Sequence, residues 1–196
     1  MTTTTWQLDP AHTDISFSAK HMMITTVRGS FGDVAGTLRI DDADPETASG
    51  EIRVRAASLA TGFAARDTHL RSADFFDVER FPEIVVRFNG VEPVKGPLHR
   101  VIADVTIRDV TRPVTFAVEH VGETTNFGGT RHIAFTVEAT LNREDWGLNW
   151  NMALETGGWL VGKEIRLLVE VVADEVAADE IAAAAAPESE PAASAA

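Results

Sequence analysis

In "HIAFTVEATL", residues 132–141, every second residue is apolar, from Ile133 to Leu141. Successive side chains of a β-strand point to opposite faces, so this spacing predicts a strand with one apolar and one mostly polar face. A strand of a parallel sheet is covered on both sides and would be a continuous apolar run. The stretch therefore indicates an antiparallel sheet with one face toward water.

Seven other stretches repeat this alternation, which gives eight predicted strands. They are residues 14–21, 33–40, 50–56, 83–88, 100–109, 113–120 and 164–172. Eight such strands form either a sandwich or a closed barrel, and alternation alone does not separate the two. A barrel is favoured because several strands are long and a closed sheet leaves no edge strand to pair with other chains. We therefore expect an all-β, eight-stranded antiparallel barrel, whose interior is either filled by side chains or holds one small ligand.

A short helical insertion is predicted between the third and fourth strands, within residues 58–82. Ala64, Ala65 and Leu70 are compatible with a helix. Pro82 keeps the preceding residue out of helical backbone and fits the change into the fourth strand.

The insertion contains "RDTHLRSADFFD", residues 66–77, which has two interpretations. Its charged residues are spaced to pair with one another on an exposed helix face, while Leu70, Phe75 and Phe76 pack on the barrel. Alternatively the segment caps the barrel mouth, and Arg66 or His69 donates hydrogen bonds to a polar ligand head. Arginine suits a phosphate or carboxylate because its planar group binds two oxygens at once.

Residues 143–161, "REDWGLNWNMALETGGWLV", are too long for a tight hairpin and carry three of the four tryptophans. We call this segment the Trp-rich loop. Loops of this length inside a domain are usually functional or disordered, and the aromatic content argues against disorder. Trp146, Trp150 and Trp159 are therefore expected either to plug the barrel end or to gate a ligand.

Composition restricts the classes of partner. The formal net charge of −13 argues against a nucleic-acid or anionic-membrane binder, because both require a basic face. No apolar run approaches the roughly 18 residues of a membrane span, and the N-terminus lacks secretory features, so we expect a cytoplasmic protein without stable membrane insertion. Residues 176–196 are Ala-rich and acidic and are expected to form a disordered tail after a barrel domain at 1–175. The oligomeric state stays open, with a homodimer compatible.

Catalytic signatures are missing from the sequence. It contains no Gly-rich phosphate loop, no GxSxG and no HExxH, and its six histidines do not have zinc-site spacing. We therefore expect a non-enzyme without metal or cofactor. Two alternatives remain: a barrel hydrolase or isomerase that uses a pair such as His69 and Asp67, and a solidly packed, ligand-free interaction module.

Several motifs in order resemble the YceI family of polyisoprenoid-binding, lipocalin-like proteins. They are Trp6, His12, Phe17, His21, "VRGSF" (27–31), "RDTHLRSADFFDVERFP" (66–82), "ADVTIRDVTRPVTF" (103–116), "NREDWGLNW" (142–150) and "VGKEIRLLVEVVADE" (161–175). The resemblance implies an eight-stranded barrel whose hydrophobic cavity binds a long isoprenoid, an isoprenoid quinone or a fatty amphiphile. The predicted ligand-binding residues are Phe17, His21, Phe31, Arg66, His69, Leu70, Phe75, Phe76, Phe88, Phe116, Phe135, Trp146 and Trp150.

Overall fold

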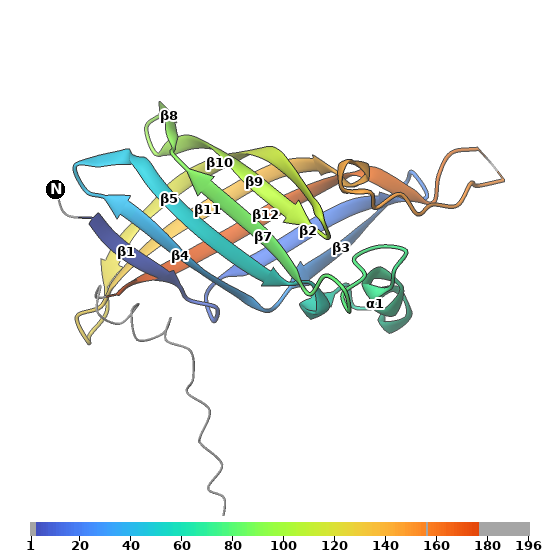
Figure 1. The fold of residues 1–196 in the computed structure, drawn as a ribbon, viewed down its shortest axis with the longest axis horizontal. Coiled ribbons are helices and arrows are strands. Elements are labelled where there is room, and N and C mark those ends of the chain that lie inside the picture. Colours follow the sequence, from blue (N-terminus) through green and yellow to red (C-terminus); the bar gives the residue numbers. More distant parts are fainter. Residues whose placement is uncertain (1–2, 156, 177–196) are drawn as a thin grey trace, which may run out of the picture.

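The computed structural model describes residues 3–155 and 157–176. These residues form one antiparallel β-sheet, one α-helix and two short 3-10 helices (Figure 1). The strands are β1 Thr3–Leu8, β2 Asp14–His21, β3 Thr25–Phe31, β4 Val34–Asp41, β5 Asp44–Arg55, β6 Leu59–Ala60, β7 Glu83–Asn89, β8 Glu92–Lys95, β9 Leu98–Ile107, β10 Val110–Thr125, β11 Arg131–Asn142 and β12 Val161–Val176. The helices are α1 Ala64–Arg71, η1 Ala56–Ser58 and η2 Arg143–Trp146.

The sheet closes into a barrel in the order β1-β4-β5-β7-β9-β10-β11-β12, because β12 pairs with β1. Ala173 of β12 lies opposite Leu8 of β1, and Val176 lies opposite Thr5. The predicted eight-stranded antiparallel barrel is therefore confirmed. Val176, where the tail was expected to begin, is still part of β12; the rest of that predicted tail lies outside the described residues.

The strand that closes the ring, β1, was not predicted. Thr4, Trp6 and Leu8 are its buried positions, and a threonine in the first of them hides the apolar alternation. The predicted strand β2 pairs with the first part of β12, while β1 pairs with the last part. β3, also not predicted, pairs with β2 and with β6, so this group extends the barrel wall at one end.

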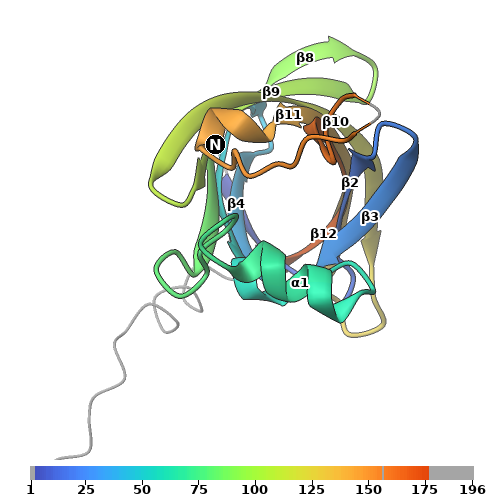
Figure 2. The same cartoon turned by 90° about the vertical axis from the view of Figure 1, so that its right-hand side faces the viewer.

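Helix α1 lies between β6 and β7, where the helical insertion was predicted, and it covers part of one barrel end (Figure 2). We call this end the α1 mouth. The Asp67 carboxylate accepts hydrogen bonds from the backbone N–H (3.0 Å) and hydroxyl of Thr61. Arg71 donates to the carbonyl of Ala57 at 2.9 Å and to that of Leu59. The helix is thereby tied to the η1–β6 segment.

These contacts correct one interpretation of residues 66–77. Arg66 and Asp67 both bond to Thr61, and Arg71 bonds to backbone carbonyls. Arg66, Asp67 and Arg71 therefore do not pair with one another along an exposed helix face but fix the helix over the mouth, while Asp74 lies 2.9 Å from His69. The other part of this interpretation is confirmed, because Leu70, Phe75 and Phe76 pack on the barrel core.

Two glycines give aromatic side chains room in the barrel wall. Gly50 lies between Leu38 and Phe88 on neighbouring strands, and a Cβ there would come within 2.6 Å of the Phe88 ring. A Cβ on Gly29 would lie 2.5 Å from the ring of its partner Phe17. Both rings occupy space that a side chain on the neighbouring strand would otherwise fill.

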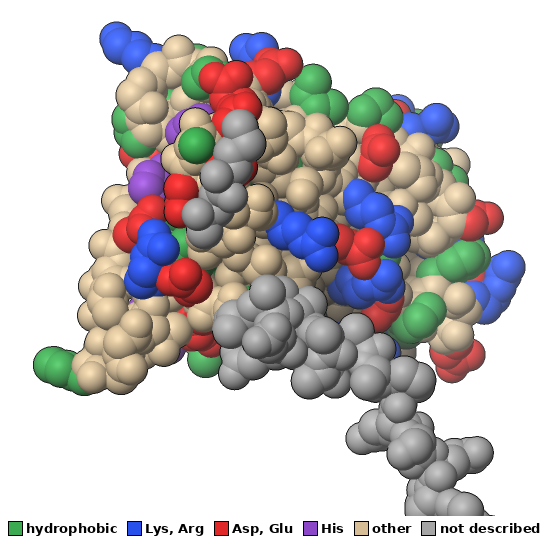
Figure 3. All heavy atoms as spheres, turned by 60° about the vertical axis from the view of Figure 1, so that its left-hand side comes forward, with side chains coloured by type: hydrophobic (Ala, Val, Ile, Leu, Met, Phe, Trp, Pro, Cys, Tyr) green, Lys and Arg blue, Asp and Glu red, His purple; other side chains and the backbone are tan. Residues whose placement is uncertain are grey.

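The face of the molecule seen in Figure 3 carries interspersed acidic and basic side chains, with hydrophobic ones between them. Examples are the ion pairs of Arg53 with Glu51 and Glu83, and of Arg87 with Glu51. Such exposed pairs contribute little to stability. Within the described part of the chain, no helix has the length and apolar character needed to cross a bilayer.

Candidate ligand-binding cavity

The barrel encloses a cavity of about 980 Å³, which is at the upper end of the usual range for small-molecule sites. Its lining extends from Phe63 and Leu160 at the α1 mouth to Asp42 and Pro45 at the other end. The cavity therefore follows the barrel axis from end to end. The alternative of a solidly packed interior is wrong.

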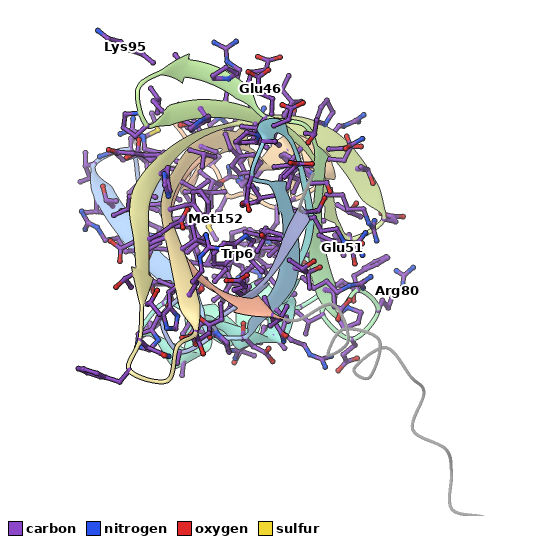
Figure 4. The ribbon with its side chains drawn as sticks, turned by 90° about the vertical axis from the view of Figure 1, so that its left-hand side faces the viewer. Trp6, Glu46, Glu51, Arg80, Lys95 and Met152 are labelled. Atoms are coloured by element: carbon purple, nitrogen blue, oxygen red, sulfur yellow. The ribbon has the colours of Figure 1, made fainter. Side chains whose placement is uncertain are left out.

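The wall of the cavity is almost entirely apolar. The alternating strands send aromatic and aliphatic side chains inward from all around the barrel (Figure 4). All thirteen predicted ligand-binding residues line this cavity, including both Phe116 and Phe135. The structure thus brings the whole predicted set together, and their binding of a ligand stays a prediction.

Aromatic contacts join α1 to the Trp-rich loop at the mouth. His69 lies edge to face with Trp150, with ring centroids 4.5 Å apart, and with Phe75 at 5.2 Å. Phe75 and Trp150 are 5.5 Å apart. Trp146 is buried deeper, and its indole Nε1 donates to the carbonyl of Val105 at 3.0 Å. The three tryptophans of the loop therefore differ: Trp146 anchors the loop and Trp150 borders the mouth. Trp159 is 51% exposed and does not line the cavity, so it does not plug the barrel end.

Arg143 is a cavity-lining residue that sequence reasoning missed. It is only 5% exposed, and its guanidinium donates to the carbonyls of Gly162 at 3.0 Å, Val161 at 3.4 Å and Leu148. Burial lowers its pKa below the usual range, with a smaller opposite effect from Glu144. Within the described residues it forms no ion pair with a carboxylate. Its sequence context does not distinguish it from an ordinary loop arginine.

The predicted head-binding residues are also held at this mouth. Arg66 donates to the hydroxyl of Thr61 at 2.7 Å and to its carbonyl at 2.9 Å. His69 Nε2 lies 2.9 Å from a carboxylate oxygen of Asp74. Since Asp67 is bonded to Thr61, the His69–Asp67 pair of the enzyme hypothesis is not formed.

The opposite end of the cavity has different polar groups. Asp42, His99, His120 and Glu123 line it. The Nε2 atom of His120 is buried and has no hydrogen-bond partner among the described residues, and its ring lies 5.5 Å from that of Phe135. In the same part of the chain, no group of three or more His, Asp or Glu side chains is close enough to hold a metal.

The cavity is therefore electrostatically asymmetric. Lys20, Arg66 and Arg143 line it near the α1 mouth, whereas Asp42 and Glu123 line the other end. An anionic group is favoured at the first end and repelled from the second.

Known proteins resemble this chain in sequence and in fold. UPF0312 protein SA2479 of Staphylococcus aureus (strain N315) is 35% identical over 164 residues, covering 83% of this chain and 93% of that protein. The crystal structure of Burkholderia cenocepacia BcnA superposes with a TM-score of 0.73 at 19% identity, covering 84% of this chain and 98% of that one. A structure described as a polyisoprenoid binding domain from Saccharophagus degradans, implicated in plant cell wall breakdown, gives 0.65 at 14% identity, covering 87% and 98%.

At these identities the two solved structures bear on the fold alone, and they support the same barrel architecture. The family assignment rests on sequence. The model of the YceI-like domain matches residues 6–173, nearly the whole described chain. The protein belongs to the YceI-like family.

Proposed function

We propose that the barrel binds a long-chain amphiphile, of the polyisoprenoid, isoprenoid quinone or fatty type, and carries or sequesters it. The observation that carries this proposal is the apolar cavity of about 980 Å³ along the barrel axis, with polar groups only near its ends. A polyisoprenoid binding domain with the same fold supports the ligand class. A binding role rather than catalysis fits a cavity whose wall is almost entirely apolar.

Apolar burial is sufficient for tight binding. Each isoprene unit has five carbons, so its burial contributes about 4 kcal/mol at roughly 0.8 kcal/mol per carbon. Eight units would sum to about 30 kcal/mol, above the practical ceiling of about 20 kcal/mol. A long chain must therefore lie partly outside, or lose much of this gain as its torsions become ordered. The apolar wall gives affinity, and selectivity for the head group comes from the ends.

We place the ligand's polar head at the α1 mouth. Arg66 and Arg143 line this end, and Lys20, whose ammonium donates to Thr26 at 3.1 Å, lies beside it. Arg143 supports this placement most strongly, because its buried guanidinium donates to neutral carbonyls and, among the described residues, forms no ion pair with a carboxylate. An anionic head would supply the missing countercharge.

Two matched tryptophan substitutions on β9 test the proposal. Ala103 is 2% exposed and lines the cavity, whereas its neighbour Ile102 is 52% exposed and points outward. Ala103→Trp fills part of the lumen, and Ile102→Trp adds the same ring to the outer wall. The measurement is mass spectrometry of an organic extract from each purified full-length protein.

We expect a long-chain lipid in the extract of the wild type and of Ile102→Trp, and several-fold less in Ala103→Trp at an unchanged melting temperature. Extracts that contain no lipid, combined with failure of the wild type to bind a fluorescent prenyl probe, would refute the proposal. Equal lipid in both variants would show that the lipid binds elsewhere.

A further inference from the structure

Six large hydrophobic side chains are exposed around the α1 mouth, each between 45% and 78%. They form what we call the apolar rim: Met22, Met23 and Ile24 in the β2–β3 turn, Phe63 before α1, and Met152 and Trp159 in the Trp-rich loop. Among the described residues, half of the large hydrophobics that are exposed belong to this rim. Single exposed apolar residues need no explanation, but a group around one opening indicates a binding surface.

The rim segments are bonded to one another. The N–H of Met22 donates to the carbonyl of Leu160 at 2.8 Å, and that of Leu160 donates to the carbonyl of Met152 at 2.9 Å. Ala153 forms a β-bridge with Trp159, so residues on both sides of the loop's tip are paired. The exposed side chains therefore project from an organised surface.

The rim is continuous with the cavity. Phe63 belongs to both, and Leu160, which is bonded to the rim backbone, also lines the lumen. In the two end-on orientations, α1, the β2–β3 turn and the Trp-rich loop surround the α1 mouth (Figure 2), and Met152 lies within the barrel outline when seen from the opposite end (Figure 4). An apolar surface thus encircles the opening of an apolar lumen.

The opposite barrel end carries an acidic hairpin. The end of β4, the turn and the start of β5 hold Asp41, Asp42, Asp44 and Glu46 within six residues, without a basic residue among them. Figure 4, which faces this end, labels Glu46 at its edge. The apolar rim therefore lies at one barrel end and the acidic β4–β5 hairpin at the other, where Val121 and Phe127 of the β10–β11 hairpin are also exposed.

We propose that the apolar rim docks reversibly on a bilayer of neutral, zwitterionic lipid. In this position the α1 mouth opens onto the bilayer and the acidic end points to water. An apolar chain that leaves the cavity through a wetted mouth must hydrate every carbon, and contact between the rim and the lipid surface removes that barrier.

A lipid surface fits the rim better than a protein partner. The side chains come from three separate turns around an opening, whereas a protein bound there would close the lumen. Met adapts to an irregular surface, and Trp favours the interface between lipid and water. The net charge of −13 and the acidic far end disfavour anionic lipid, so the contact is expected to be hydrophobic and only weakly dependent on salt.

Flotation or sedimentation of the full-length protein with phosphatidylcholine vesicles tests the docking. The rim variant is Met23→Asp combined with Ile24→Asp. The matched control is Val121→Asp combined with Phe127→Asp, which changes two exposed hydrophobics of the β10–β11 hairpin. We expect the vesicle partition coefficient to fall at least tenfold in the rim variant and to stay within twofold of wild type in the control.

A second readout locates the contact. Vesicles with brominated acyl chains should quench the fluorescence of Trp159. The contribution of Trp159 is the difference between the fluorescence of the wild type and that of Trp159→Phe. Absence of wild-type binding, equal loss in both variants, or binding only to anionic vesicles would overturn the proposal. Concentration-dependent dimerisation through the rim without vesicle binding would overturn it in favour of a second copy.

The docking does not depend on which ligand fills the cavity. Lipid extracted from the rim variant should equal that of the wild type, while its exchange with vesicles should be at least tenfold slower. If the cavity proves empty, vesicle binding still tests the rim. If the cavity is filled but vesicles are not bound, only the docking is refuted.

Discussion

The ring of His69 in α1 meets the ring of Trp150 in the Trp-rich loop edge to face, with centroids 4.5 Å apart. This contact joins two segments that are far apart in the chain at the α1 mouth. Both rings also contact Phe75, which lines the cavity beneath them. The mouth is therefore closed on one side by a cluster of three aromatic rings.

Removing one ring of this cluster should loosen the mouth. Trp150→Ala is expected to lower the free energy of unfolding by about 1–3 kcal/mol, because each aromatic pair contributes about 0.5–1.5 kcal/mol beyond its buried area. Release of a fluorescent fatty probe, followed by stopped flow, should be at least several-fold faster. Trp159→Ala is the control. Because Trp159 is exposed, this substitution is expected to leave the free energy of unfolding and the release rate unchanged. Equal release rates in the two variants would contradict a gating role for Trp150.

A charge placed inside the lumen tests the facing of β10. Phe116 lines the cavity, while its neighbour Thr115 is exposed. Phe116→Arg is expected to lower the free energy of unfolding by about 3–5 kcal/mol, as for a buried unpaired charge. If the hollow lumen accommodates the arginine side chain, we expect the variant to expel the ligand instead. Thr115→Arg should do neither. Urea denaturation and lipid extraction measure the two effects, and wild-type values for Phe116→Arg in both would show that the assignment is wrong.

The placement of the head group predicts a selective effect of Arg66. Arg66→Met keeps the length and apolar stem of the side chain and removes its charge. We expect the affinity for a long-chain prenyl phosphate to fall about tenfold, while that for the matching prenyl alcohol changes less than twofold. His99→Gln, at the opposite end of the cavity, is the control. Equal losses for phosphate and alcohol would mean that Arg66 acts on the structure of the mouth.

The connection between β1 and β2 should depend on pH. His12 Nδ1 lies 2.5 Å from Asp9 Oδ2, and this hydrogen bond lowers the pKa of Asp9. The hydrogen bond, together with the negative charge of Asp9, raises the pKa of His12. The stabilisation from Asp9 is lost as pH falls through its lowered pKa. That from His12 is complete below about 6.5 and is lost as pH rises through its raised pKa. The pair is therefore strongest between about pH 4 and 6.5.

NMR titration of the His12 ring measures this directly. Asp9→Asn should bring the pKa of His12 back toward about 6.5. The stability difference between Asp9→Asn and wild type should be larger at pH 5.5 than at pH 9. An unchanged His12 titration in the variant would show that the pair does not form in solution.

Much of the barrel could be predicted because period-2 alternation assigns each side chain to a face. Phe116 and Phe135 were placed on the apolar faces in this way, and both line the cavity. β1 was not predicted because Thr4 occupies one of its buried positions, and a threonine is not counted as apolar in the alternation. Alternation also leaves undetermined whether the lumen is hollow, since that depends on strand tilt and stagger as well as on facing.

Predicting the site from sequence was less complete at the mouth. The residues were correctly located there, but their partners depend on tertiary folding. His69 bonds to Asp74, five residues on, and Asp67 turns back to Thr61. Arg143 lies in a loop whose sequence gives no sign of burial, because the carbonyls that surround it come from both sides of that loop.

The most direct test of ligand binding is a crystal structure of the full-length protein after incubation with a long-chain prenyl phosphate. We predict continuous elongated density along the barrel axis, in contact with Phe116 and Phe135, with its polar end beside Arg66 and Arg143. A lumen that contains only ordered water or collapsed side chains after saturation would contradict the proposed function.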